Sequence, residues 1–261
     1  MGTVVKSEQT LEHQQDRLSL ETSILSILLY VEFGAGVLFG AYGLHQYTTE
    51  GELLWVIVAG LLMFFSGSHY LKTVKNRSAL GNIWAGRSGE DFVSRLLEEE
   101  LPNDCYILND VTIQAGTKSA QIDHVIVSSG GVHLVETKAY RGHLRGSAES
   151  DYLTLSKPDG DETQVTNPIS QSRRHAGIFK QFLDRRPLEF DQQNIEWSAA
   201  LVDNDCSWQI NGNDHRLDYA RKIPERIQVQ QRGTKHGNDA VRKLLLQLGA
   251  DVPTELREAT N

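Results

Sequence analysis

Three residues in the middle of the chain, Asp123, Glu136 and Lys138, have the types and spacing that phosphoryl chemistry uses. Two carboxylates held close together repel each other unless a cation lies between them. An oxygen-preferring divalent ion such as Mg²⁺ or Mn²⁺ fits that position. With a lysine beside it, such a set can orient a water and stabilise the charge that develops on a phosphate. The alternative is an ordinary cross-strand cluster of salt-bridged side chains.

A hairpin is expected to bring these residues together. Two runs rich in β-branched residues, 120–128 and 132–138, are joined by Ser-Ser-Gly-Gly, which favours a tight turn. If the turn is centred between residues 129 and 130, opposed residues have numbers that sum to 259. Asp123 then faces Glu136 on one side of the sheet, and Lys138 lies on the same side. The apolar neighbours of these residues predict a buried sheet, where three charges without a function would be costly.

Further elements are predicted around the hairpin. Ser88 is expected to cap a helix over 89–101, and 105–113 is expected to be the first strand. Asn167-Pro168 marks the start of a helix that ends near residue 183. A strand over 197–202 and a helix over 238–248 follow. The order predicts an α/β or α+β layered domain with a mixed central sheet.

Four separated motifs resemble one known family. They are GRSGED (86–91), QIDHVIV (121–127), GVHLVETKAYRG (131–142) and NPISQSRRH (167–175). Their order is similar to that of the nuclease-related domain, or NERD, family, and the match covers roughly residues 84–203. That family resembles the PD-(D/E)XK nucleases, so the resemblance implies an αβββαβ restriction-endonuclease-like core.

The resemblance also implies roles for particular residues. Asp123 and Glu136 match the metal-binding carboxylates, and Lys138 matches the lysine that positions or polarises the attacking water. Glu90 matches an upstream acid that adds to the metal shell, although an acid in the first turn of a helix also suits the helix dipole. Gln171 matches a glutamine of the second helix, with a solvated or capping role as its alternative. The implied cofactor is Mg²⁺ or Mn²⁺.

Two histidines lie close to these positions in the sequence. His175 stands four residues after Gln171, where related nucleases have an aromatic residue, and so departs from the pattern. His124 neighbours Asp123 but points to the opposite face of the strand. We expect His124 to be a hydrogen-bonded core histidine and not a metal ligand.

Basic residues gather after the motifs. Arg141, Arg145, Arg173 and Arg174 could follow a phosphate backbone, or they could be solvated surface charges. The formal net charge of the chain is −8, which argues against nonspecific coating of nucleic acid but not against a local basic groove. The expected partner is therefore nucleic acid, more specifically DNA.

The N-terminal third has a different character. Residues 24–44 and 53–71 are each apolar over the length of a membrane-spanning helix, and a short polar connection joins them. Lys and Arg flank the pair but are missing from the connection, so both termini and the large domain are expected in the cytoplasm. Buried core helices are the alternative. Glu32 within the first span could be functional. Gly36 and Gly40 could pack the hairpin or form a homodimer.

These observations predict a multi-pass protein of the cell membrane. The expected divisions are a cytoplasmic segment 1–23, a transmembrane helical hairpin 24–71, a linker 72–85, a nuclease-like domain 86–203 and a C-terminal extension 204–261 that packs on or completes it. Two distant cysteines, Cys105 and Cys206, suit reduced thiols. The predicted function is a membrane-anchored, metal-dependent phosphodiesterase, most simply a DNA endonuclease. The alternatives are an inactive nucleic-acid-binding or scaffold module and a membrane sensor that uses Glu32.

Overall fold

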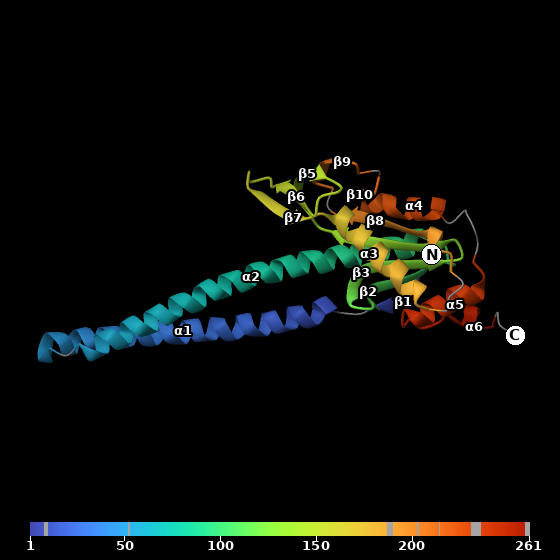
Figure 1. The fold of residues 1–261 in the computed structure, drawn as a ribbon. Coiled ribbons are helices and arrows are strands. Elements are labelled where there is room, and N and C mark those ends of the chain that lie inside the picture. The colour runs from blue at the N-terminus through green and yellow to red at the C-terminus, as the bar shows by residue number, and fades with distance from the viewer. Residues whose placement is uncertain are drawn as a thin grey trace. The chain divides into compact units, whose positions relative to one another are not determined.

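The computed structural model describes residues 1–7, 10–51, 53–186, 190–202, 204–213, 215–230 and 236–258. The chain divides into two compact units, a helical one over 10–85 and a mixed one made of 1–9 and 86–261 (Figure 1).

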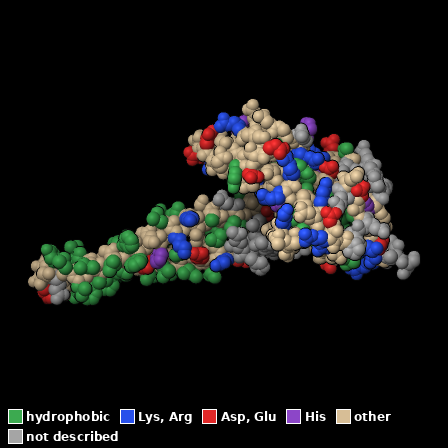
Figure 2. Space-filling model, in the orientation of Figure 1, with side chains coloured by type: hydrophobic (Ala, Val, Ile, Leu, Met, Phe, Trp, Pro, Cys, Tyr) green, Lys and Arg blue, Asp and Glu red, His purple; other side chains and the backbone are tan. Residues whose placement is uncertain are grey.

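Two long helices build the helical unit. α1 spans Thr10–Glu50 and α2 spans Leu54–Glu100, and Gly51 between them has a φ of +75° that favours glycine. Both helices are long and apolar enough to cross a membrane. Many of their large apolar side chains are exposed, among them Leu38 at 73% and Phe64 at 72%. Figure 2 shows hydrophobic side chains over much of the visible surface of this hairpin.

Small residues let the two helices approach each other. A Cβ added at Gly36 would lie 3.3 Å from Met63 Cγ, and one added at Gly43 would lie 2.8 Å from the backbone of Trp55. Ala59 is 7% exposed in the same contact. Gly36 and Gly40 therefore pack within the hairpin, and this use of the pair lends no support to a homodimer. Glu32 reaches across the hairpin, with Oε2 2.8 Å from His69 Nδ1.

The predicted break before residue 88 is wrong. α2 continues through residues 72–88, so Ser88 lies inside a helix and does not cap one, and residues 72–85 are helical. The segment contains glycines but no proline. A glycine costs a helix about 1 kcal/mol, which is too little to end one that is continued on both sides. From residue 86 on, α2 belongs to the mixed unit.

The mixed unit is built on a six-stranded sheet with the order β1-β2-β3-β4-β8-β10. β2, β3 and β4 form an antiparallel meander, while β1, β8 and β10 each pair in parallel. The strands are β1 (Thr3–Ser7), β2 (Tyr106–Ala115), β3 (Lys118–Ser128), β4 (Gly131–Lys138), β8 (Ile195–Leu201) and β10 (Leu217–Tyr219).

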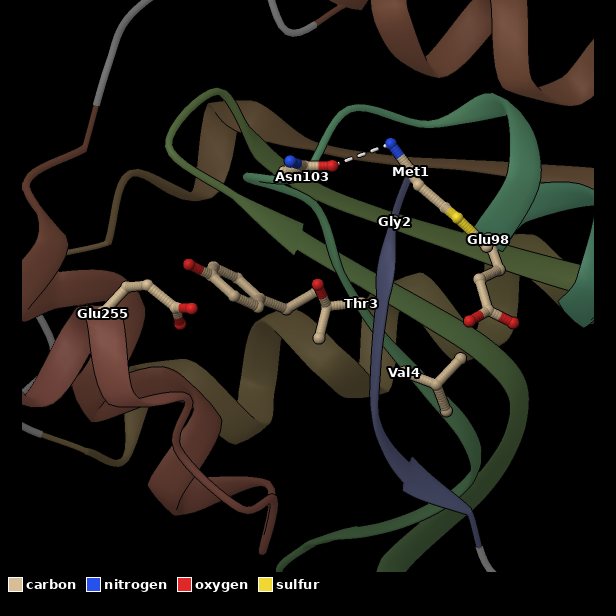
Figure 3. Close-up of a pocket in the computed structure, with 8 residues that line it drawn as sticks. Met1, Gly2, Thr3, Val4, Glu98, Asn103 and Glu255 are labelled. Carbon is tan, nitrogen blue, oxygen red and sulfur yellow. Dashed lines mark hydrogen bonds between the residues drawn. The ribbon is translucent and has the colours of Figure 1, made fainter.

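The first strand was not anticipated from the sequence. Residues 1–23 were predicted as a separate N-terminal segment, yet β1 is the edge strand beside β2. The Met1 amino group donates to Asn103 Oδ1 at 2.8 Å (Figure 3). The Gly2 N–H donates to the Glu98 carbonyl. A hollow of about 550 Å³ lies beside this strand. None of the residues predicted for chemistry lines it.

Helices cover both faces of the sheet. On one face, α3 (Pro168–Asp184), α5 (Asn238–Gln247) and α6 (Thr254–Glu258) share a core with alternate residues of β2, β3 and β4. On the other face, the last turns of α2 and α4 (Ile223–Gln230) pack against Ile107, Ile126 and Val135. The short 3₁₀ turns 192–194 and 220–222 complete the connections. The expected α/β core with a mixed sheet is confirmed, and the C-terminal extension contributes to it.

A second sheet has three strands between β4 and α3 in sequence and a fourth that follows β8, and no complete sheet was predicted there. Its order is β7-β6-β5-β9, with β5 (Gly142–Ser147), β6 (Tyr152–Ser156), β7 (Glu162–Thr166) and β9 (Cys206–Asn211). From the sequence, only residues 152–155 of this sheet read as a strand, and they form most of β6. The strands are short and polar, and β7 alternates between exposed and half-buried residues, so little hydrophobic periodicity marks them.

Two local predictions are confirmed in detail. The β3–β4 pairs Val125↔Leu134 and Ile126↔His133 have numbers that sum to 259, as the turn chemistry predicted. Asn167 caps α3, and its side chain accepts from the Ile169 N–H at 3.0 Å with Pro168 in the first turn.

Candidate functional site

The sheet opens at the level of Asp123. The last β3–β4 pair is His124↔Val135, and the β2–β3 ladder passes from Asn109↔His124 to Val111↔Ile122 without pairing Asp110 with Asp123. Asp110 has a φ of +52°, which is unusual for a residue other than glycine.

In β2 and β3, the side chains also switch from one face of the sheet to the other at this level. Leu108 and Val111 lie in the same core, as do Val125 and Ile122, although three residues apart in a regular strand would face opposite ways. An irregularity of this kind bends a strand and redirects its side chains. At this interruption, the side chain of Asp123 takes the place of a backbone partner: its Oδ2 accepts a hydrogen bond from the Thr137 backbone N–H at 2.6 Å.

Glu136 lies at the centre of the site. It is 3% exposed, its Oε1 is 2.7 Å from Lys138 Nζ, and its Oε2 is 3.3 Å from His175 Nδ1. Burial by itself would raise the pKa of Glu136, but the neighbouring His175 and Lys138 outweigh it and lower that pKa. Burial would lower the pKa of Lys138, whereas Glu136 and Asp123 raise it, and the net change is upward. The site therefore holds a carboxylate and an ammonium group in contact.

The other two predicted carboxyls are crowded. Burial, with the charges of Glu136 and Glu90, raises the pKa of Asp123 well above its ordinary value. Burial, Asp110 and Glu136 raise the pKa of Glu90 to about 7. Lys138 opposes the shift of both groups. The fold thus brings the three predicted metal ligands into one electrostatic neighbourhood and adds Asp110 to it.

The donor set has the chemistry of a site for a hard divalent cation. The donor atoms of the three predicted residues are all carboxylate oxygens, and Glu136 Oε2 is buried without a hydrogen bond among the described residues. Within the same described part of the chain, no three His, Cys, Asp or Glu side chains are arranged to hold a metal ion. The predicted residues Asp123, Glu136 and Glu90 therefore fit such an ion by their chemistry, while this arrangement does not enclose one.

The two residues of α3 singled out by the sequence have different surroundings. His175, which departed from the family pattern, is the residue that reaches Glu136. Gln171 lies one turn earlier, half-buried, and lines a separate hollow with Asn167 and Arg174. The spacing of four residues places both on one side of the helix, so it could have marked His175 as well.

The predicted nucleic-acid arginines are mostly paired with acids. Arg141 lies 3.5 Å from Asp205, Arg173 lies 2.6 Å from Glu149, and Arg145 pairs with Glu162. Arg174 differs, because it lines a surface hollow together with Lys118.

A buried hydrogen-bond network lies behind the site, and the sequence did not indicate that its members contact one another. His124, 1% exposed, has Nδ1 2.7 Å from Asn109 Oδ1 and Nε2 3.1 Å from Thr137 Oγ1. Burial lowers the pKa of His124 to about 4, so the ring is neutral at pH 7. The prediction of a hydrogen-bonded core histidine is confirmed. Its partners come from strands that the sequence could not align at this detail, since the irregularity at Asp110 is not visible in the residue pattern.

Comparison with known proteins agrees with the motifs. Residues 85–201 match the model of the nuclease-related domain family. An uncharacterized protein of Bacillus anthracis is 30% identical over 104 residues, which are 40% of this chain and 49% of that protein. The chain thus spans about half the length of the curated relative it matches. The crystal structure of protein VC1899 from Vibrio cholerae covers 87% of this chain and 57% of its own, at 14% identity and a TM-score of 0.28, which is too low to support an argument. Residues 85–201 of the chain are therefore a nuclease-related (NERD) domain.

Proposed function

We propose that this domain is a divalent-metal-dependent phosphodiesterase that cleaves DNA, with Asp123, Glu136 and Lys138 at its centre. The observation that carries the proposal is the buried Glu136–Lys138 contact beside a second, crowded carboxyl at the point where the sheet opens. Three ionisable groups in so small a buried volume cost folding free energy, and functional sites are where such costs are retained.

The chain's own groups have distinct parts in this proposal. Asp123, Glu136 and Glu90 would hold the ion, and His175 and Lys138 keep Glu136 ionised and oriented. Lys138 stays protonated, because the carboxylates raise its pKa, so it serves as a charged donor to a water or a phosphate oxygen and not as a base. When bound, a Mg²⁺ or Mn²⁺ ion would supply Lewis acidity and an activated water.

The direct test is cleavage by the full chain in detergent micelles. We expect it to nick or cut plasmid DNA with Mn²⁺ or Mg²⁺ and to lose this activity in EDTA. Single-stranded DNA, linear duplex and RNA as parallel substrates identify the class of nucleic acid. Absence of metal-dependent cleavage on all of them would contradict the proposal.

A basic hollow offers a place for the DNA backbone. Lys118 and Arg174 line a surface hollow of about 470 Å³ between α3 and the β2–β3 turn, and the Arg185 guanidinium lies against Gly116 of that turn. As far as the described residues go, these three cations form no ion pair. Figure 2 shows Lys and Arg side chains, interspersed with acids, over the face of the domain that α3 covers. Unpaired cations bind phosphates without first giving up a partner.

The double variant Lys118→Gln/Arg174→Gln is expected to bind duplex DNA about tenfold more weakly at 0.1 M salt. The slope of log K against log salt should fall by about 2, because two phosphate contacts are lost. Fluorescence anisotropy of a labelled 20-base-pair duplex in EDTA measures both quantities without cleavage. Arg145→Gln is the matched control, since Arg145 is already paired with Glu162. Equal losses in the control and the double variant would count against the hollow.

The helical unit is proposed to anchor the domain in the cell membrane, with both termini cytoplasmic. Support comes from two exposed apolar helices, from Lys72, Lys75 and Arg77 after the second apolar run, and from a connection without Lys or Arg. A cysteine introduced at Thr48 should react with an impermeant maleimide added to intact cells, whereas one at Lys157 in the domain should react only after lysis. The reverse pattern would invert the topology.

A second candidate function is a tethered nucleic-acid-binding module without catalysis. It is favoured by the contacts of Glu136 with Lys138 and His175 and by the lack, within the described residues, of a three-ligand group. Isothermal titration with Mn²⁺ separates the two functions. DNA binding without saturable metal binding would favour the module.

A further inference from the structure

A chain of four hydrogen-bonded side chains crosses the sheet behind the candidate site. Asn109 Nδ2 donates to Ser94 Oγ at 2.7 Å, which leaves Asn109 Oδ1 facing His124 Nδ1 at 2.7 Å. His124 Nε2 lies 3.1 Å from Thr137 Oγ1. The four members come from α2, β2, β3 and β4, which are the same four elements that supply the acidic residues of the site.

The chemistry of the partners fixes the direction of these bonds. An amide oxygen only accepts, so His124 Nδ1 carries the ring proton. In the neutral ring Nε2 then accepts, and the Thr137 hydroxyl donates to it. The imidazole is therefore held at both nitrogens by bonds of defined direction.

Each member of the network is close in sequence to a residue of the site. Asn109 precedes Asp110, His124 follows Asp123, and Ser94 lies one helical turn after Glu90. Thr137 stands between Glu136 and Lys138, and it acts on both sides of the sheet. Its hydroxyl binds the network behind, while its backbone N–H donates to Asp123 Oδ2 in front.

We propose that Thr137 and His124 are positioning residues that set the placement of Asp123 against Glu136. The β3–β4 ladder does not do so, because its last pair is His124↔Val135 and the residues that follow are unpaired on this side. The bonds through Thr137 replace the missing ladder bonds. This inference rests on the proposed function for the nature of the ligand, a divalent cation held by the two carboxylates.

The test compares Thr137→Val, which keeps the shape and removes the hydroxyl, with Thr137→Ser, which keeps the hydroxyl. Isothermal titration of the full chain in detergent with Mn²⁺ is the readout, since removing a group that orients a metal ligand costs about 10–100-fold in affinity. We expect Thr137→Val to bind Mn²⁺ at least about tenfold more weakly. Thr137→Ser should stay close to the wild type, and DNA binding in EDTA should be unchanged in both.

The remaining outcomes distinguish this inference from the nuclease proposal. Equal Mn²⁺ affinity in all three proteins would do so while leaving the nuclease proposal standing. Metal binding that weakens only in Thr137→Val, in a protein that never cuts DNA, would refute the nuclease proposal and keep this one. Absence of Mn²⁺ binding by the wild type would refute both.

Two further measurements protect the test against a variant that fails to fold. Nitrogen chemical shifts of the His124 ring report its tautomer in the wild type, and a proton on Nε2 would overturn the inference. Ser94→Ala removes the half-buried far end of the network and should weaken Mn²⁺ binding in the same direction by less. An unchanged affinity in a folded Ser94→Ala, together with an unfolded Thr137→Val, would count against the network.

Discussion

Replacing Lys138 with methionine is expected to reduce DNA cleavage by at least about 10²-fold, because a preorganised charge at the reacting phosphate is worth that much or more. Lys138 is the ammonium group in contact with Glu136 Oε1, at 2.7 Å. Methionine keeps most of its volume and removes the charge. The rate of plasmid nicking at saturating Mn²⁺ is the measurement, with DNA affinity in EDTA determined on the same protein and expected to change little.

Two controls separate chemistry from folding in this prediction. Lys138→Met removes the ammonium group beside the buried Glu136 and leaves the contact with His175, so the variant must be shown to be folded by its circular dichroism spectrum. Lys138→Arg keeps the charge, but a planar guanidinium does not replace a compact ammonium, so cleavage should remain low in a protein that folds normally. Lys157→Met, an exposed lysine between β6 and β7, should cut at the wild-type rate. Cleavage by Lys138→Met within fivefold of wild type would remove Lys138 from the reaction.

Replacing Asp123 with asparagine is expected to abolish metal-dependent cleavage and to stabilise the metal-free protein above pH 7. Burial and the nearby carboxylates raise the pKa of Asp123 well above its ordinary value, so its ionised form is unfavourable in the fold. Asparagine still offers an oxygen to the Thr137 N–H but never ionises. We expect a gain of at least ~1 kcal/mol, which corresponds to about 2–4 °C in Tm for a domain of this size.

The pH dependence has a defined sign. A carboxyl whose pKa is raised by folding binds protons more tightly in the folded state, so stability falls as pH rises from the unfolded pKa towards the folded one. For Glu90 that interval runs from its ordinary value of 4.5 to about 7, and for Asp123 it reaches well above 3.8. Glu136 has a lowered pKa and acts oppositely, since its contribution is lost only as pH falls below its ordinary value.

Thermal unfolding in EDTA between pH 5 and pH 8 therefore tests the crowding of the carboxyls. The Tm of the wild type should fall as the pH rises, and it should fall less in Asp123→Asn and in Glu90→Gln. Added Mn²⁺ should raise the Tm of the wild type at pH 8 more than that of Asp123→Asn, because a cation favours the ionised carboxyls. A wild-type Tm that rises or stays level over this range without metal would contradict the pKa shifts on which the prediction stands.

The domain's hairpin could be read from the sequence because local chemistry specifies it. The Ser-Ser-Gly-Gly turn and the alternation of β-branched residues fix the register, since a slip by one residue would expose the core face of both strands. The β3–β4 pairs follow that register. The start of α3 at Asn167-Pro168 was equally local, since the cap depends on two adjacent residues.

Other features required the whole fold. The predicted helix start at Ser88 was wrong. A serine acts as an N-cap only where the preceding residues are not helical, and α2 continues through Ser88. The strand β1 pairs with residues about a hundred positions away, and nothing in a five-residue strand indicates its partner. The second sheet is polar and short-stranded, so hydrophobic periodicity indicated only residues 152–155 of it.

For the site itself, the sequence by itself determined which residues have the chemistry: Asp123, Glu136 and Lys138 in one hairpin, with Glu90 upstream. Their spacing and the turn between them suffice, because alternate residues of a strand point to the same face of the sheet. Only the tertiary structure decided that His175 reaches Glu136, that Asp110 joins the acids and that Thr137 links Asp123 to the network behind it. Those contacts arise where helix α3 crosses the sheet and where β2 and β3 leave their regular ladder together, and neither event has a counterpart in local residue pattern.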